Sequence, residues 1–496
     1  MIEAPPIEGI AIDPVDWAIT PVSIQQLVVY VVAENQELKS RLSRIEDQLA
    51  QNSQNSSQPP SQDGFRKPAV AVKAKSQKQR GGQPGHAGHQ PKFYELSAVD
   101  EVHRHLPTAC PICGVAMTGE DPEPYRHQIV ELPVLRPQIT EHQLDQLTCE
   151  HCGTATRAKL PDKVGVSHYG ERLTAAVGLL SSGNYQSHSK IQTLLNRLFG
   201  IEISIASVNR LRQEISAALK IPVQAAQQFV QGAGYLHSDE TSFRQGNADG
   251  QNPNQTKGWL WSIVTTSVVV FEVALSRGGA IARQLIGAAY TGIVISDRYR
   301  AYEWLDVAQR QLCWAHIKRD ITAMCERSGV SAEIGAALRR RQKRLFRLWH
   351  QVRDGTLSRD AFQLKVELLR RGFKHELTRA VDLIDTPNEQ SPLAKTLRTC
   401  KELLKWEATL WTFVTHPGIE PTNNAAEQAL RPAVIWRRLS FATQFTAGSQ
   451  FVARMLTVIS TLKLQERDVL EFLTQACRAS RFGHPMPSLL PQAQTP

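Results

Sequence analysis

Two aspartates stand at the ends of predicted strands, where they could take part in metal-dependent chemistry. Asp239 ends a strand predicted over 235–239, and Asp297 ends a buried strand predicted over 292–297. In a mixed sheet the ends of adjacent strands bring such residues together. Two neighbouring carboxylates repel each other, and a divalent cation resolves that repulsion. The pattern therefore predicts a cation site at one edge of a sheet.

A third acid, Glu427, lies on a late predicted helix, with Asn423 one turn before it and Arg431 one turn after it on the same face. Together the three acids could hold two Mg²⁺ or Mn²⁺ ions that activate water and stabilise an in-line displacement at phosphorus. Structural roles fit the spacing too, since Asp297 could cap the following helix and Asn424-x-x-Glu427 fits a capping box. The rival carboxylates are Glu240, Glu272, Asp306 and Asp320.

Four cysteines form two pairs with the spacing of metal ligands. Each C-x2-C pair is followed by Gly, which allows a tight turn, and four thiolates are a ligand set that zinc prefers. The 35 residues between the pairs exceed the usual ~15–20, so we expect a zinc ribbon with an inserted loop and a structural Zn²⁺. Two unrelated redox pairs are the alternative. The four residues are Cys110, Cys113, Cys149 and Cys152.

The charge of the chain favours a nucleic-acid partner. Lys and Arg number 57 against 47 acids, a net charge of +10, and phosphates attract such an excess. Residues 64–96 contain a single acid and form a predicted basic arm that could follow a DNA backbone, although a solvated tail is the alternative. The arm residues that we expect to contact DNA are Lys73, Lys75, Lys78 and Arg80.

A helix-turn-helix pattern follows the cysteines. One predicted helix ends near Phe199, and a second, capped by Ser204, presents Asn209 and Arg210. This arrangement is typical of DNA-reading domains. Any helical hairpin could give the same pattern, so the reading of DNA by this segment is a prediction.

The N-terminal region carries a heptad repeat that predicts a coiled coil and a homodimer or higher oligomer. One polar residue, Asn35, falls at a core position and would fix the register. An amphipathic helix packed on the protein's own core is the alternative. The two rows are Ile24, Val31, Leu38 and Ile45, and Val28, Asn35, Leu42 and Leu49.

Other features bound the compartment. No run of 18 apolar residues exists, so no membrane span is expected. The acidic, Pro-rich start is unlike a secretory signal, and the scattered cysteines suit a reducing compartment. We therefore expect a cytoplasmic, nucleoid-associated protein.

The order of predicted elements indicates a multidomain α+β protein with a mixed sheet. From 234 to 328 the order is β-β-β-α-β-α-β-α, followed by a helical and basic stretch. The predicted domains are a tail (1–22), a coiled coil (23–50), a flexible basic linker (51–94), a zinc ribbon (95–160), a helix-turn-helix domain (161–228), a catalytic domain (229–448, with a helical insertion at about 330–415) and C-terminal helices (449–496).

Motifs along nearly the whole chain resemble those of transposases of the insertion-sequence-66 family. They include GGQPGHAGH, HSDETSFR, GWLW, SDRYRAY, CWAHIKRD, PTNNAAEQALRP and WRRLSFAT, in this order. The resemblance implies an RNase H-like catalytic domain with a DDE triad at Asp239, Asp297 and Glu427. It also implies an accessory role for Cys313 and His316, although their C-x2-H spacing alone favours core packing.

The resemblance implies a DNA transposase that binds the terminal inverted repeats of its element and catalyses metal-dependent cleavage and strand transfer. Expected partners are double-stranded DNA, further copies of the chain and small accessory proteins encoded by the same element. The late DNA-binding candidates are Arg431, Arg437 and Arg438. Two alternatives stay open: a catalytically inactive DNA-binding protein derived from an element, and an RNase H-like metal nuclease without strand transfer.

Overall fold

The structure is a computed structural model that describes residues 4–5, 12–50, 93–162, 164–165, 167–383 and 391–491. The predicted DNA contacts at Lys73, Lys75, Lys78 and Arg80 lie outside these residues. The chain divides into two compact units, each described by itself below. The larger comprises 1–68, 141–193 and 203–496, and the smaller 69–140 and 194–202.

The heptad region forms one continuous helix, as predicted. Asp13 caps the short helix α1 (Pro14–Ile19) by accepting N–H groups from Val15 and Asp16, and α2 spans Val22–Ala50. The heptad residues Ile24, Val31, Leu38 and Leu42 are all exposed on α2. An apolar stripe of this kind fits a helical partner, and self-association stays a prediction.

Short elements surround the cysteine pairs. In the smaller unit, the 3₁₀ turn η2 spans Leu96–Ala98 and a single bridge joins Ala109 to Ala116. In the larger unit, β1 (Gln146–Thr148) pairs antiparallel with β2 (Ala155–Arg157). This hairpin flanks Cys149 and Cys152.

Four helices precede the main sheet. The predicted helix-turn-helix boundaries are found: α4 ends at Phe199, and Ser204 caps α5 by accepting the Ser207 N–H. Helix α3 lies against α5 at Gly178, where a Cβ would come within 3.1 Å of the Ile215 side chain. Their bounds are α3 Glu171–Ser182, α4 His188–Phe199, α5 Ile205–Ala218 and α6 Lys220–Gln231.

A five-stranded mixed sheet with the order β5-β4-β3-β6-β7 forms the centre of the larger unit. The first three strands are antiparallel neighbours, and β6 and β7 add in parallel beside β3. The strands are β3 Tyr235–Ser242, β4 Trp259–Val264, β5 Val269–Ala274, β6 Ile293–Ser296 and β7 Arg310–Leu312. The predicted strands are therefore confirmed, except that β3 continues past its predicted end at 239 to Ser242, so Asp239 lies within the strand.

The connections after β5 and β6 are short. Helix α7 (Gly279–Ile286) is the first helix of the predicted order. The second helix, predicted in the segment RAYEWLD (300–306), is in the structure only the 3₁₀ turn η3 (Arg300–Tyr302). That prediction was wrong because Asp306 accepts the Ala308 N–H and begins a second short turn, η4 (Val307–Gln309). The buried side chains of Tyr302 and Leu305 hold the segment on the core.

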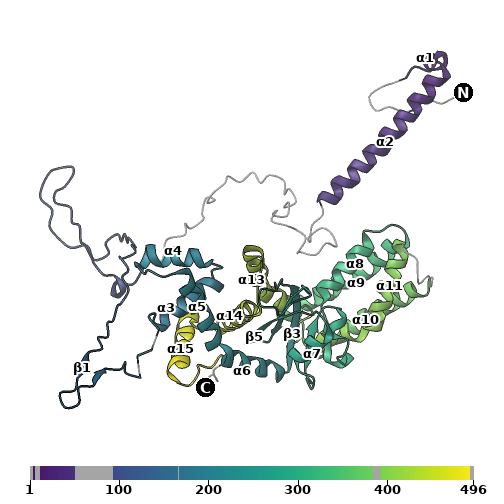
Figure 1. Cartoon of the computed structure of the whole chain (residues 1–496). Helices are drawn as coiled ribbons and strands as arrows, with labels where there is room; N and C mark the ends of the chain where they lie inside the picture. The colour runs from purple at the N-terminus through teal and green to yellow at the C-terminus, as the bar shows by residue number, and fades with distance from the viewer. Residues whose placement is uncertain are drawn as a thin grey trace. The chain divides into compact units, whose positions relative to one another are not determined.

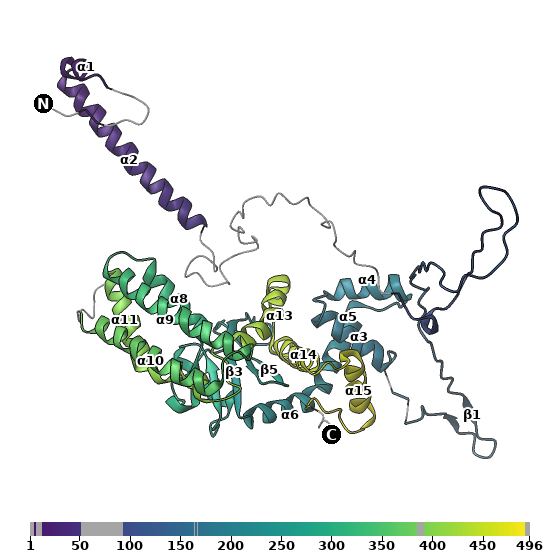
Figure 2. The same ribbon diagram turned by 180° about the vertical axis from the view of Figure 1, so that it is seen from behind.

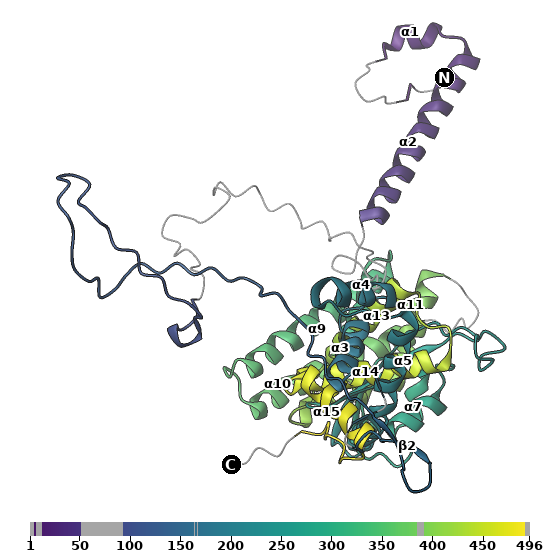
Figure 3. The ribbon, with the colours of Figure 1, turned by 60° about the vertical axis from the view of Figure 1, so that its left-hand side comes forward.

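Helices lie on either side of the sheet (Figures 1 and 2). Ile295 and Leu312 belong to the hydrophobic cluster of the helical insertion, while Leu236, Trp261 and Phe271 belong to the cluster of the other helices. Figure 3 shows α3, α5, α14 and α15 gathered together. Helix α8 spans Trp314–Cys325, and the insertion predicted at about 330–415 comprises α9 Val330–Arg353, α10 Arg359–Val381, α11 Pro392–Lys405, η5 Glu407–Leu410 and α12 Thr412–Thr415. The last helices are α13 Asn424–Ser440, α14 Thr446–Leu464 and α15 Val469–Phe482.

Helix α14 covers the outer edge of the sheet. Thr457 and Thr461 accept the N–H groups of Phe271 and Val269 on β5, at 2.9 and 3.0 Å. An uncovered edge strand would offer these groups to another chain. Residues of α14 and α15 thus share one hydrophobic cluster with the sheet, across the predicted boundary at 448.

Candidate active site

The two predicted aspartates lie at the same edge of the sheet. In the parallel pair, His237 of β3 stands opposite Ile295 of β6. Asp297 follows the end of β6, and its charge acts on Asp239, two residues beyond His237 on β3. Burial raises the pKa of Asp239 well above its usual range, and the charges of Glu240 and Asp297 raise it further. Carboxylates crowded in this way are suited to a divalent cation.

Glu427 joins this edge because the start of α13 is fastened to β3. The fully buried Asn423 donates from Nδ2 to the Ser238 carbonyl at 2.8 Å, and its Oδ1 lies 3.1 Å from Nδ1 of His237. Burial lowers the pKa of His237 to about 4, so this imidazole is neutral and can donate to Asn423. Asn423 and His237 thereby position the acid one turn later on the helix.

The capping-box interpretation of Glu427 is wrong. Helix α13 begins at Asn424, so its N-cap is Asn423, whose side chain makes no capping hydrogen bond. The buried Oε1 of Glu427 has no hydrogen-bond partner in the described part of the chain. Burial raises the pKa of Glu427, Arg319 lowers it, and Asp297 raises it. An acid in this state is available as a ligand.

Each aspartate uses one oxygen in a local contact. Asp297 accepts the Tyr299 N–H through Oδ1 at 2.8 Å, and Asp239 accepts the Glu240 N–H through Oδ1 at 2.9 Å. Asp297 therefore closes a local turn but does not cap the following element, since the N-cap of the 3₁₀ turn η3 is Tyr299. A second oxygen of each carboxylate makes no hydrogen bond to described residues, so these local contacts and cation binding are compatible.

A buried arginine stands beside the acids and was not anticipated. Arg310 on β7 is 1% exposed, lies over the Trp406 ring and donates to the Asp297 carbonyl at 3.4 Å. Burial lowers its pKa to about 10, while Asp297 raises it. Its positive charge offsets part of the acidic cluster. A lone arginine in a strand gives no sequence signal for this role.

The rival carboxylates have structural partners. Glu240 pairs with Arg277 at 2.7 Å and accepts the Tyr302 hydroxyl at 2.7 Å. Burial, with the charge of Asp297, raises the pKa of Glu240 to about 7. The other partners are Arg298 for Asp320, the Ala308 N–H for Asp306 and the charge of Arg454 for Glu272. These contacts favour the triad over its rivals.

Cys313 and His316 meet Glu427 at the start of α8. The ligand atoms of all three lie within 4.8 Å of one another, and His316 Nδ1 is 3.8 Å from Glu427 Oε1. Burial raises the pKa of Cys313 to about 11 and lowers that of His316 to about 4, with Arg319 also lowering the latter. The C-x2-H pair therefore lies beside Glu427, and core packing alone does not explain why its two polar atoms point toward this acid.

The predicted DNA-binding residues differ in their surroundings. Arg210 and Arg431 are exposed, and Asn209 is half-buried. Arg437 donates to the hydroxyls of Thr241 at 2.8 Å and Ser242 at 2.9 Å. Arg437 therefore fastens α13 to the end of β3. Its contact with DNA, like that of the exposed Arg438, stays a prediction.

The two cysteine knuckles have the same backbone turn. The Gly114 N–H donates to Cys110 O, the Gly153 N–H donates to Cys149 O, and both glycines have φ near +70° (71° and 72°). Hydrogen bonds lower the pKa of two of the thiols. A bond with the Cys113 backbone lowers the pKa of Cys110, and a bond with the Thr154 side chain lowers that of Cys152. Such turns suit thiolate ligands. The pairs belong to different units, and the four-thiolate site stays a prediction.

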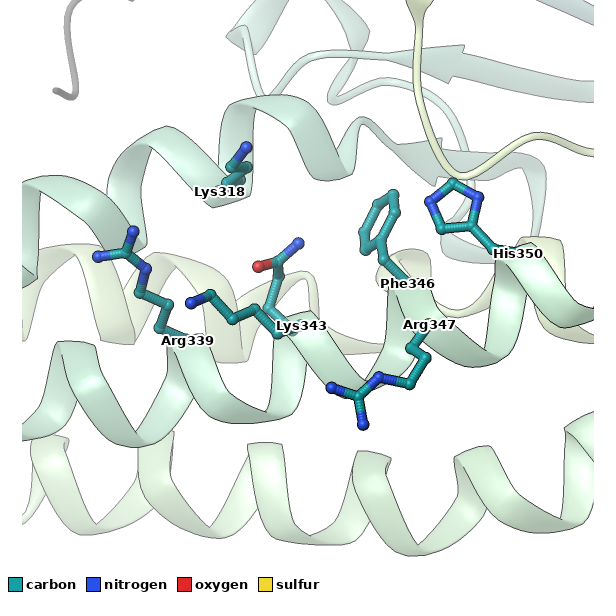
Figure 4. Close-up of a pocket in the computed structure, with 7 residues that line it drawn as sticks. Lys318, Arg339, Lys343, Phe346, Arg347 and His350 are labelled. Carbon is teal, nitrogen blue, oxygen red and sulfur yellow. The ribbon is translucent and has the colours of Figure 1, made fainter. Parts of the chain in front are cut away.

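A basic groove of about 440 Å³ lies between α8 and α9 (Figure 4). Lys318 extends from α8, and Arg339 and Lys343 extend from α9, one turn apart. Among the described residues no acid forms an ion pair with these cations or with Arg347. The lining residues are Lys318, Arg339, Gln342, Lys343, Phe346, Arg347 and His350.

Comparisons with known proteins give the family. Residues 167–450 match the family described as Transposase IS66 family, and residues 13–92 match a family of unknown function, DUF6444. Because the first match covers more than half of the chain, the chain belongs to the IS66 transposase family. The resemblance inferred from the motifs is thereby confirmed.

Two relatives from Sinorhizobium fredii are named only as uncharacterized proteins. The chain is 24% identical to y4hP over 414 residues, which cover 77% of this chain and 72% of y4hP. It is 26% identical to y4qI over 251 residues, which cover 46% of this chain and 45% of y4qI. Separately, no helix within the described ranges has the length and apolar character needed to cross a membrane.

Proposed function

We propose that the protein is a DNA transposase that cleaves the ends of its element and joins them to target DNA. The observation that supports this proposal is the electrostatic interaction of the buried Asp239 with Asp297 and Glu427, within a chain of the transposase family. The strand order, three antiparallel strands followed by two parallel ones, supports an RNase H-like catalytic domain. Catalytic inactivity and hydrolysis without joining are the competing outcomes.

The three acids fit a divalent cation because they are crowded, partly buried and, at Glu427 Oε1, without a hydrogen-bond partner among the described residues. Mg²⁺ or Mn²⁺ bound there would activate a nucleophile and offset negative charge at phosphorus. Asp239 and Asp297 hold the cations, and Glu427 completes the ligand set. The Asn423 tether and Arg310 keep these carboxylates in place.

In the proposed reaction, water displaces the 3′ oxygen at the element end, breaking one phosphodiester bond and leaving a 3′ hydroxyl. That hydroxyl then attacks a phosphorus in target DNA. The bond between this phosphorus and the 3′ oxygen of the target strand breaks. Both steps are in-line displacements at phosphorus, so one site can serve both.

DNA contacts are proposed on several surfaces. The arm residues Lys73, Lys75, Lys78 and Arg80, the α5 residues Asn209 and Arg210, and the late arginines Arg431, Arg437 and Arg438 are the predicted contacts. To these we add the groove residues Arg339 and Lys343, since cations repeating every turn of a helix present charge at intervals of about 6 Å. Such a row attracts a phosphate backbone.

The remaining parts are proposed to assemble the complex. A zinc ribbon built on the two cysteine knuckles holds DNA, and the heptads of α2 join copies of the chain so that two element ends are held together. Small accessory proteins from the same element are further candidate partners. A transposase acts where the DNA is, so the proposed location is the bacterial cytoplasm, at the nucleoid.

The deciding experiment is incubation of the purified full chain with labelled element ends, a plasmid target and Mg²⁺. Joined products support the proposal. Nicked ends without joining would indicate a nuclease, and binding without any cut would indicate an inactive DNA-binding protein. Asp239→Asn is the matched negative variant, because it removes one ligand charge at nearly the same side-chain volume.

A further inference from the structure

One group of three metal-binding side chains stands out among the described residues: Cys313, His316 and Glu427. We propose that these three residues hold a divalent cation of the Zn²⁺ type, and that this cation ties together the two chain segments at the base of the helical insertion. The inference shares Glu427 with the proposed function and rests on it to that extent. Its other two ligands lie outside the triad.

The donor atoms select the class of cation. A thiolate, an imidazole and a carboxylate are the three ligand types that bind zinc in proteins, and three of them leave a position open for water. Mg²⁺ prefers oxygen ligands and waters, so it does not suit a site with sulfur and nitrogen donors. The site is therefore distinct in chemistry from the edge occupied by Asp239 and Asp297.

The geometry leaves a gap of the right size. His316 Nδ1 and Glu427 Oε1 are both buried, 3.8 Å apart, and neither has a hydrogen-bond partner among the described residues. This separation is too long for a hydrogen bond. It lies within the sum of the usual Zn–N and Zn–O bond lengths, about 4.1 Å, so one ion can bind both atoms.

The third ligand already has the outer contact expected of a metal-bound sulfur. Cys313 is 1% exposed, and its Sγ accepts the backbone N–H of Asn423 at 3.1 Å. Contacts to the ligands from outside the coordination sphere orient them and tune the metal. The donor comes from the N-cap of α13, the helix that carries Glu427.

The position of the site gives it a structural consequence. Cys313 precedes the insertion, Glu427 follows it, and the Trp314 N–H donates to Pro421 O at 2.9 Å between them. A cation bound here closes the loop that contains the whole insertion, and a cross-link that closes a long loop restricts the unfolded chain most. It also fixes Oε1 of Glu427 and leaves the second oxygen for the triad.

Cobalt provides a direct probe, because Co²⁺ bound by a cysteine sulfur has a charge-transfer absorption band. We would titrate Co²⁺ into the full chain in which the four ribbon cysteines are serine, namely Cys110→Ser, Cys113→Ser, Cys149→Ser and Cys152→Ser. The expected result is a sulfur-to-cobalt band that saturates at about one equivalent. Absence of the band would overturn the proposal. The unsubstituted chain should bind one further equivalent. A circular-dichroism spectrum of the substituted chain close to that of the unsubstituted chain checks that the substitutions have not unfolded the helical domain.

Matched variants assign the band to its ligands. Cys313→Ser should abolish it, and His316→Ala should weaken Co²⁺ binding more than about a hundredfold, since loss of outer contacts alone costs about 10- to 100-fold. Cys400→Ser, which changes another fully buried cysteine, should leave the band unchanged. A band that persists in Cys313→Ser would refute the assignment.

The two proposals fail in different ways. Asp239→Asn should abolish strand transfer and keep the cobalt band. If the chain without the four ribbon cysteines shows the band and wild-type protein never joins element ends, the transposase proposal fails and the cation site stands. If wild-type protein joins ends and the chain without the ribbon cysteines shows no band, the cation site fails and the transposase proposal stands.

Discussion

Glu427 is the residue on which the catalytic proposal depends most. In Glu427→Gln the side chain keeps its shape and loses its charge, so cation binding should weaken and strand transfer should fall more than about 100-fold. In metal-free protein the melting temperature should stay near that of the wild type, because Oε1 has no hydrogen bond to lose among the described residues. Strand-transfer rate and melting temperature are the two measurements.

The exposed Glu420 provides the control for this substitution. Glu420→Gln makes the same chemical change seven residues earlier in the chain and should keep full activity. Normal transposition by Glu427→Gln, or loss of activity in Glu420→Gln, would move the catalytic role to Glu420.

Glu240 makes a separate prediction about pH. Its pKa in the folded protein is about 7, against 4.5 ordinarily, so the folded state holds the proton more tightly than the unfolded chain does. The stability that this proton contributes is complete below about pH 4.5 and is lost as pH rises through about 7. From pH 5 to 8 the wild type should therefore lose on the order of 3 kcal/mol relative to Glu240→Gln. Unfolding free energies that change in parallel would contradict this.

Single residues also show where sequence reasoning was insufficient. Asp297 directly follows the apolar strand β6, as predicted, whereas Asp239 lies within β3, which continues to Ser242 instead of ending at 239. The hydrogen bonds of Asn423 with His237 and Ser238 join residues that are 186 and 185 positions apart in the sequence. Local patterns contain no information on such pairs, and the same holds for the burial of Arg310.

Helix α9 tests whether the insertion binds DNA. Arg339→Gln with Lys343→Gln should reduce the affinity for DNA of any sequence and lower the slope of log K against log salt by about 0.9 per lost contact. Arg340→Gln with Arg344→Gln is the control, because it removes the same charge from exposed positions of the same helix outside the groove. Equal effects of the two pairs would mean that the net charge, rather than the groove, attracts DNA.

Helix α2 tests self-association. Deletion of residues 1–50 should lower the number of subunits measured by light scattering, because it removes the exposed heptad residues through which the copies would contact each other. Leu38→Glu should act in the same direction, and Gln36→Glu, which adds the same charge at an exposed position off the heptad rows, should not. An unchanged subunit number after the deletion would place self-association elsewhere.

Elements were easier to predict than their short connections. The strands β4 and β5 were evident because runs such as WLWSIV and VVFEVA are apolar and β-branched. The segment RAYEWLD has helix-forming residues, yet Asp306 begins a separate turn and the helix does not form. A side chain that accepts a backbone N–H can override helix propensity over a few residues.

At the scale of the molecule, metal content tests the ribbon. Residues 93–160 leave many apolar side chains exposed, including Ile112, Tyr125 and Val134, so this region lacks a core of its own and should depend on a cation to fold. Cys110→Ser with Cys149→Ser should lose about one equivalent of zinc per chain relative to the wild type. Hydrogen exchange should rise in this region and stay unchanged in the sheet. Retention of the full zinc content would refute the four-thiolate site.

The meeting of Trp314 and Pro421 at the base of the insertion has a consequence for the order of folding. Glu427 can reach the aspartates only after more than a hundred residues of chain have returned to the sheet. If those residues were a random coil, closing the loop would carry a large entropic cost. The helical hairpins of the insertion form through contacts between neighbours in the chain, which are fast to make. We therefore expect the insertion to fold first and to bring Glu427 back to the sheet, so that the proposed active site is completed last.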